Sequence, residues 1–103
     1  MRDLSLSMRT LVIYDISDDR SRVKVSTILK EFGLRRVQYS GFMGETNPND
    51  REVLERLLRR YLTSERDSIY IVPLCNRCFS LLRVMAKSKR EKERLLGEDV
   101  VVL

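Results

Sequence analysis

The sequence contains no histidine, and its only cysteines are Cys75 and Cys78. Without histidine, the chain cannot form a Ser-His-Asp or Cys-His nucleophile pair, a histidine-rich zinc site or a histidine general base. Two cysteines imply no disulfide framework and are compatible with a reducing compartment. Any catalysis must therefore use carboxylates, lysine, tyrosine, serine or a bound metal.

Long apolar runs are also missing. Residues 1–7, MRDLSLS, lack the apolar core of about 7 to 15 residues that marks a signal peptide. No run in the chain approaches the roughly eighteen apolar residues of a membrane span. We therefore expect a cytoplasmic protein with no membrane partner. The glycines are too dispersed for a phosphate-binding loop, so ATP or NAD use is not expected.

Positive charge, in contrast, is abundant. The chain has 20 lysines and arginines against 15 aspartates and glutamates, a formal net charge of +5 and a pI near 9.6. This balance suits a polyanionic partner such as DNA or RNA, although a merely solvated charged surface has the same composition. At 103 residues the chain fits a single domain, which we place at 8–103 after a short extension at 1–7. A second copy would help so small a domain to bury its apolar faces.

The hydrophobic pattern alternates between strand and helix. Residues 10–14 form a continuous apolar run typical of a buried strand, and residues 34–44 alternate like one long strand or two short ones. With two strands in that stretch, the order is the βαββαβ pattern of a ferredoxin-like α+β sandwich. An additional C-terminal strand at 99–103 has no obvious neighbour in so small a sheet, and we expect it to pair across a homodimer.

The helix that follows the first strand has clear start and stop signals. Ser17 is its expected N-cap, Asp18 and Asp19 suit the positive end of its dipole, and Gly33 provides a left-handed stop. Its apolar residues recur at i, i+3, i+4 and i+7, namely Val25, Ile28, Leu29 and Phe32.

The second half of the chain contains another helix and strand. Asn47 followed by Pro48 predicts an N-cap and a helix over 48–62. Residues 68–74 form a strand in which Pro73 indicates a sheet edge or a strand end. The remaining segments are expected to be a turn, a short strand and a solvated basic loop: 75–82, 82–86 and 87–94.

Three carboxylates follow the first strand, and they differ in what they imply. Asp18 and Asp19 lie where any helix favours negative charge. Asp15 ends a buried apolar run, where a charge needs solvent or a partner, so it is the candidate ligand for Mg²⁺. A metal nuclease commonly needs two or more carboxylates, and Asp15 alone provides one. A symmetric dimer would bring a second Asp15.

Basic and aromatic residues surround these acids. The basic set would neutralise nucleic-acid phosphates, or it would only solvate the surface; it comprises Arg20, Arg22, Lys24, Arg35, Arg36 and the loop 87–94. Tyr14, Tyr39 and Phe42 have the chemistry to stack on bases, although such residues are more often core. The lone C-x-x-C of Cys75 and Cys78 is compatible with a redox pair or half of a zinc site completed by a second chain.

Residues 11–45, LVIYDISDDRSRVKVSTILKEFGLRRVQYSGFMGE, closely resemble the N-terminal half of CRISPR-associated protein two. The matching elements occur in order: an apolar strand with YDI, a DD-x-x-R-x-K-V helix start, G-L-R-R-V-Q-Y-S, and F-x-G-E. With DSIYIVPLC and the terminal DVVVL, the resemblance extends over nearly all of residues 8–103.

The resemblance implies a ferredoxin-like homodimer whose terminal strand packs on the partner's sheet. It also implies a role in CRISPR spacer acquisition with the integrase, CRISPR-associated protein one, and Mg²⁺-dependent endonuclease activity on single-stranded RNA or double-stranded DNA. The family's proposed metal ligand corresponds to Asp15, with Tyr14 beside it. The associated basic and aromatic positions correspond to Arg22, Lys24, Arg36 and Phe42.

Two positions depart from the family pattern. Lys24 stands where some members have arginine and so lacks the bidentate phosphate fork, and Gly41 replaces a bulkier apolar residue before Phe42. Two alternatives to catalysis by this chain stay open. One is a non-catalytic dimeric bridge that holds duplex DNA in the integrase complex, and the other is a toxin-like ribonuclease of similar small fold.

Overall fold

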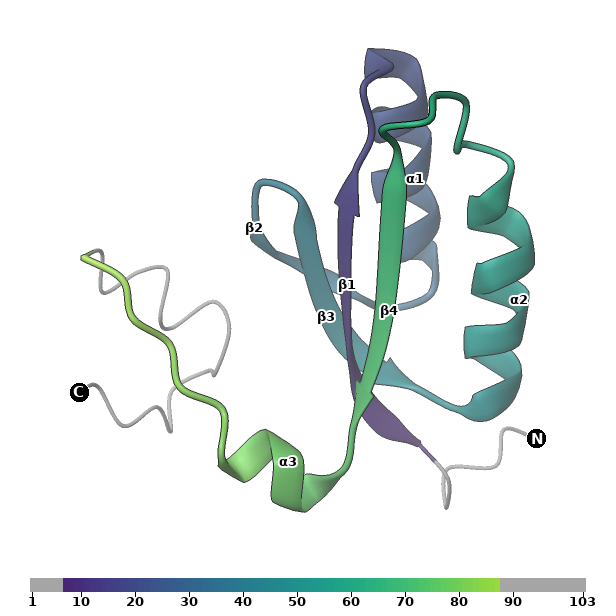
Figure 1. Ribbon diagram of the computed structural model, residues 1–103. Helices are drawn as coiled ribbons and strands as arrows, with labels where there is room; N and C mark the ends of the chain where they lie inside the picture. Colours follow the sequence, from purple (N-terminus) through teal and green to yellow (C-terminus); the bar gives the residue numbers. More distant parts are fainter. Residues whose placement is uncertain (1–6, 88–103) are drawn as a thin grey trace.

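The computed structural model describes residues 7–87, and in it four strands form one antiparallel sheet in the order β2-β3-β1-β4. The strands are β1 (Met8–Asp15), β2 (Arg35–Gln38), β3 (Gly41–Thr46) and β4 (Ser68–Leu74). The helices are α1 (Asp19–Glu31), α2 (Pro48–Arg59) and the short α3 (Asn76–Ser80). Helices α1 and α2 cover one face of the sheet (Figure 1). The order β1-α1-β2-β3-α2-β4 confirms the expected βαββαβ, ferredoxin-like α+β fold.

Strand β1 lies between β3 and β4 and supplies the centre of the core. Its side chains alternate, so Thr10, Val12 and Tyr14 are buried on the helix side. Ile13 and Asp15 are exposed on the other face. In the described residues 7–87, the main core cluster lies between the sheet and the helices: Val12, Tyr14, Ile16, Val25, Leu29, Leu34, Phe42, Leu54 and Leu58.

Helix α1 starts one residue later than its sequence predicts. Asp18, not Ser17, is the N-cap, because Asp18 Oδ2 accepts hydrogen bonds from the backbone N–H and hydroxyl of Ser21, at 2.9 and 2.8 Å. The backbone N–H and hydroxyl of Ser17 instead donate to Asp67 Oδ1, at 3.0 and 2.9 Å. The expected stop at Gly33 is confirmed, since its φ of 85° lies in the left-handed region.

Residues 34–44 contain two strands joined by a tight turn at Tyr39 and Ser40. The pairing of β2 with β3 shifts register between Arg36 and Gln38. Gly41 fits here because a Cβ at that position would lie 2.7 Å from the Gln38 Cγ atom. A larger residue at position 41 would therefore have to displace the Gln38 side chain.

The second half agrees in part with its prediction. Helix α2 has a capping box between Asn47 and Asp50 with Pro48 at its start, but it ends at Arg59 rather than at residue 62. Its last turn tightens there, as the Tyr61 N–H donates to the carbonyl oxygen of Leu58, three residues back, at 3.0 Å. Strand β4 has the expected bounds and lies at a sheet edge, as its proline indicated.

The segment after β4 differs most from expectation. Part of the predicted turn at 75–82 is helix α3, and the short strand predicted at 82–86 is wrong. Residues 83–86 find no sheet neighbour in the described chain and instead border a hollow with Leu11 and Val37. The predicted loop beyond residue 87 and the terminal strand at 99–103 lie outside the described residues, and the domain bounds 8–103 stay a prediction. None of the helices between residues 7 and 87 is long and apolar enough to cross a membrane.

Candidate nucleic-acid site

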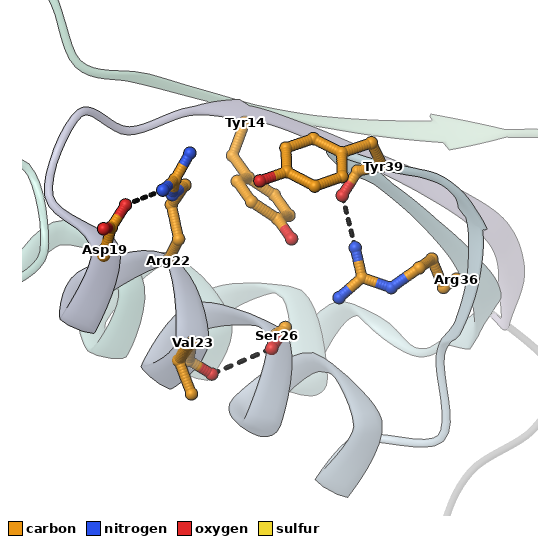
Figure 2. Close-up of a pocket in the computed structure, with 7 residues that line it drawn as sticks. All are labelled: Tyr14, Asp19, Arg22, Val23, Ser26, Arg36 and Tyr39. Atoms are coloured by element: carbon orange, nitrogen blue, oxygen red, sulfur yellow. Dashed lines mark hydrogen bonds and ion pairs between the residues drawn. The ribbon is translucent and has the colours of Figure 1, made fainter.

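A hollow of about 340 Å³ lies between the first half of α1 and the β2–β3 turn. Figure 2 shows two guanidinium groups, of Arg22 and Arg36, on opposite sides of two phenol groups, of Tyr14 and Tyr39. The complete lining is Tyr14, Asp19, Arg22, Val23, Ser26, Arg36 and Tyr39. Two cations and two aromatic hydroxyls around one hollow are suited to a phosphate and an adjoining base or sugar.

Helix α1 contributes one face to this hollow. Asp19, Arg22, Val23 and Ser26 follow the spacing i, i+3, i+4 and i+7, which places them on one side of a helix. Arg22 forms an ion pair with Asp19, and the Ser26 hydroxyl donates to the carbonyl oxygen of Val23 at 2.8 Å. The helical spacing was a signal that could have identified Val23 and Ser26, which the sequence analysis missed.

Arg36 is held over the hollow by two contacts. Its guanidinium donates a hydrogen bond to the carbonyl oxygen of Tyr39 and lies over the Phe42 ring, 4.8 Å from the ring centroid. The Phe42 ring is fully buried, and its centroid is 6.2 Å from that of Tyr14, with 27° between the ring planes. Phe42 therefore supports Arg36 from below, whereas Tyr39, which is 74% exposed, is the aromatic ring open to solvent.

Asp15 lies on the opposite face of the sheet from this hollow. Tyr14 and Asp15 are consecutive in β1, so the ring of Tyr14 enters the core while the carboxylate of Asp15 is exposed on the face without helices. Its partner across β4 is Ser68, and Ile13 and Tyr70 are exposed on the same face. At the end of β1, Tyr14 therefore lies on the helix side of the sheet and Asp15 on the opposite side.

The acids near Asp15 have other partners. Asp18 caps α1, and hydrogen bonds from Ser21, first its hydroxyl and then its backbone N–H, hold the pKa of Asp18 below the usual value. Asp19 pairs with Arg22. In residues 7–87 no three histidine, cysteine or acidic side chains are grouped so as to hold a metal ion. Of the three acids Asp15, Asp18 and Asp19, Asp15 is thus the candidate ligand for a cation.

Two further predicted residues lie outside the hollow. Arg20 and Lys24 are exposed on α1 but are not part of the face that lines it. They extend the positive surface along the outside of the helix, next to Arg22. Their contact with nucleic acid stays a prediction.

A family model described as CRISPR associated protein Cas2 matches residues 8–81. The CRISPR-associated endoribonuclease Cas2 1 of Archaeoglobus fulgidus is 49% identical over 94 residues, which are 91% of this chain and 100% of that relative. The CRISPR-associated endonuclease Cas1/endonuclease Cas2 fusion of Thermoproteus tenax is 41% identical over 56 residues, 53% of this chain and 21% of the fusion.

Solved structures show the same likeness. The hypothetical protein TT1823 from Thermus thermophilus superposes with a TM-score of 0.66 and 34% identity, over 78% of this chain and 92% of that one. A crystal structure of Cas2 superposes with a TM-score of 0.60 and 33% identity, over 81% and 91% of the two chains. Both matches extend over nearly the full length of the other protein.

Proposed function

This chain belongs to the CRISPR associated protein Cas2 family, and we propose that it is a Mg²⁺-dependent endonuclease that hydrolyses phosphodiester bonds of nucleic acid during CRISPR spacer acquisition. Single-stranded RNA is the preferred substrate in this proposal, because relatives that match nearly their full length are named endoribonucleases. Double-stranded DNA is the second substrate to test.

One observation carries the proposal: the exposed Asp15 carboxylate and the hollow between Arg22 and Arg36 lie at the same end of β1, on opposite faces of the sheet. A nucleic-acid strand that crosses this edge of the sheet would meet Arg22 and Arg36 on one face and the Asp15 carboxylate on the other. In this arrangement the two arginines would bind phosphates on one face, and hydrolysis would take place at Asp15 on the other.

The donor set at Asp15 suits Mg²⁺ when two copies are considered. Mg²⁺ prefers hard oxygen ligands and commonly takes only one or two carboxylates, keeping water in its other positions. The Asp15 carboxylate is exposed, and a two-fold axis at this face would add a second one. When bound there, the ion would supply an activated water and neutralise charge on the phosphate.

The remaining steps rest on residues of the chain. Arg22 and Arg36 would hold non-bridging phosphate oxygens, since guanidinium groups bind phosphate through paired N–H donors. Phe42 would keep Arg36 in place by its contact with the guanidinium. The exposed ring of Tyr39 would stack on a base, which favours an unpaired strand over a duplex.

A homodimer is part of this proposal. The face of the sheet opposite α1 and α2 exposes apolar side chains near Asp15, with Ile13 37%, Tyr70 62% and Val72 36% exposed. An isologous contact through this face would bury them and repeat Asp15 across the axis.

The decisive experiment replaces Asp15 without changing its size. In Asp15→Asn we expect Mg²⁺-dependent cleavage of a labelled single-stranded RNA to fall to the level of the buffer, while circular dichroism and the mass from light scattering stay unchanged. Glu52→Gln, which removes an exposed charge on α2, is the matched control and should cleave normally. Undiminished cleavage by purified Asp15→Asn would assign the activity to another site or to a contaminant.

A second candidate is a non-catalytic bridge that clamps prespacer DNA between subunits of the integrase, CRISPR-associated protein one. Two observations favour it: residues 7–87 contain no cluster of acids around Asp15, and a relative is named as a Cas1/Cas2 fusion. This candidate predicts duplex binding that weakens steeply with salt and survives Asp15→Asn. Binding that is indifferent to salt would argue against it. No observation favours the toxin-like ribonuclease.

A further inference from the structure

The two cysteines of the chain lie far from the candidate nucleic-acid site. Cys75 and Cys78 flank the first turn of α3, which is attached to the sheet by Arg9, whose guanidinium is 3.9 Å from the centroid of the Phe79 ring. At a rise of about 3.3 Å per residue, Arg9 is roughly 20 Å along β1 from Asp15. Figure 1 shows α3 at the end of β4 away from the start of α1. The two thiols are therefore not part of the candidate nucleic-acid site.

The two cysteines lie at the first turn of α3, Cys75 as its N-cap and Cys78 three residues later. The backbone N–H of Cys78 donates to Cys75 Sγ at 3.4 Å, which turns the Cys75 side chain toward Cys78. Both residues are free cysteines and both are exposed. The pair is therefore preassembled and open to a reactant from solution.

The two thiols are also chemically unequal. The Cys78 backbone N–H, and after it the Cys78 side chain, lower the pKa of Cys75 below its usual value. The same side-chain hydrogen bond and the negative charge of Cys75 raise the pKa of Cys78. Cys75 is thus the sulfur that ionises first, and Cys78 is the one that retains its proton.

A metal is the less suitable occupant of this pair. A structural zinc site takes four ligands, whereas the sequence has no histidine and no other cysteine. Residues 7–87 bring no third histidine, cysteine or acidic group to these two. A disulfide, in contrast, requires only the two sulfurs that are present.

We propose that Cys75 and Cys78 are a reversible dithiol–disulfide pair that exchanges with low-molecular-weight disulfides, Cys75 being the attacking sulfur and Cys78 the resolving one. The C-x-x-C turn, the hydrogen bond from the Cys78 backbone N–H to Cys75 Sγ, and the exposure of both residues support this assignment. Because α3 follows β4 directly and packs on β1, a disulfide would restrain the first turn after the sheet.

The exchange has two balanced steps. The Cys75 thiolate attacks one sulfur of glutathione disulfide, forming a mixed disulfide and releasing one glutathione thiolate, which takes up a proton. Cys78 then loses its proton and attacks Cys75 Sγ, releasing the second glutathione as a thiol. Two protein thiols are oxidised to one disulfide, and one glutathione disulfide is reduced to two thiols.

The test follows intact mass in buffers of reduced and oxidised glutathione, using the full chain. We expect the wild type to lose the mass of two hydrogen atoms and to retain no glutathione. Cys78→Ser should trap one glutathione on Cys75. Cys75→Ser, in which serine still caps α3, should react with glutathione disulfide roughly tenfold more slowly than Cys78→Ser.

Three results would overturn the proposal. They are equal rates for the two single variants, oxidation of the wild type only to disulfides between chains, and failure of the wild type to oxidise at potentials where glutathione is mostly disulfide. Stoichiometric Zn²⁺ in the reduced wild type, lost in both variants, would replace it with a metal clamp shared between copies.

Discussion

The guanidinium carbon of Arg36 lies 4.8 Å from the centroid of the Phe42 ring, and that ring has no exposed surface. Phe42 is therefore a buried platform rather than a surface for bases. A contact with nucleic acid that depends on Phe42 would act through the cation above it.

Replacing Phe42 tests this indirect role. Phe42→Leu should lower the free energy of unfolding by about 1–2 kcal/mol and also weaken binding of a fluorescent single-stranded oligonucleotide, because Arg36 loses its platform. Leu58→Val is a matched control, since it removes buried volume on α2 without touching Arg36. Equal loss of affinity in both variants, measured by anisotropy beside urea unfolding, would show that stability alone explains the effect.

The ion pair between Asp19 and Arg22 should restrain binding. Asp19 is an acid on the lining of a cationic hollow, and its side chain is 84% exposed. Asp19→Asn should therefore tighten oligonucleotide binding about two- to fivefold at low salt, as expected for release of an exposed pair. Binding should also become more sensitive to salt, because Arg22 is free to replace a counterion. Glu52→Gln controls for net charge, and an equal gain in that variant would remove any special role for Asp19.

Asp67 should make the fold sensitive to acid. Hydrogen bonds, first from the Ser17 backbone N–H and also from Thr63 and Ser64, lower the pKa of Asp67 to about 2 from a usual 3.8. Because the pKa is lowered, the ionised Asp67 carboxylate stabilises the folded state. This stabilisation is present above pH 4 and is lost as the pH falls toward 2. Asp67→Asn should melt at a lower temperature at pH 7 and lose less stability than the wild type over that interval. Parallel melting curves for the two proteins from pH 5 to 2 would contradict this.

Much of the fold could be predicted because it depends on local chemistry. Asn47 and Pro48 mark the start of α2, Gly33 marks the stop after α1, and the apolar pattern of 68–74 is a strand with the expected bounds. The choice of Asp18 over Ser17 as the cap could not be predicted, since it depends on Asp67, a residue 50 positions away, which takes both donors of Ser17. The segment 82–86 has an apolar composition suited to a strand, but within residues 7–87 it pairs with neither edge strand of the sheet, β2 or β4, and composition alone does not determine such pairing.

The candidate site was predicted as a list of residues rather than as an arrangement. The spacing in β1 implied that Tyr14 and Asp15 point to opposite faces, but only the packing of α1 shows which face receives Arg22. Likewise Arg36 and Phe42 are opposite each other across β2 and β3, and their contact depends on that register. The proximity of Tyr14 to Arg22 and that of Arg36 to Phe42 both depend on packing between separate elements. The local sequence of one element does not determine either of them.

The alternation of Tyr14 and Asp15 has a genetic consequence. Strand β1 is paired on both edges, with β3 and with β4, so its register cannot adjust freely. Inserting or deleting one codon within residues 9–13 would turn the phenol toward the open face and drive a carboxylate into the core. Point substitutions in this stretch should therefore be tolerated far more often than insertions or deletions. Selection should act on the number of residues in β1 as well as on their identity.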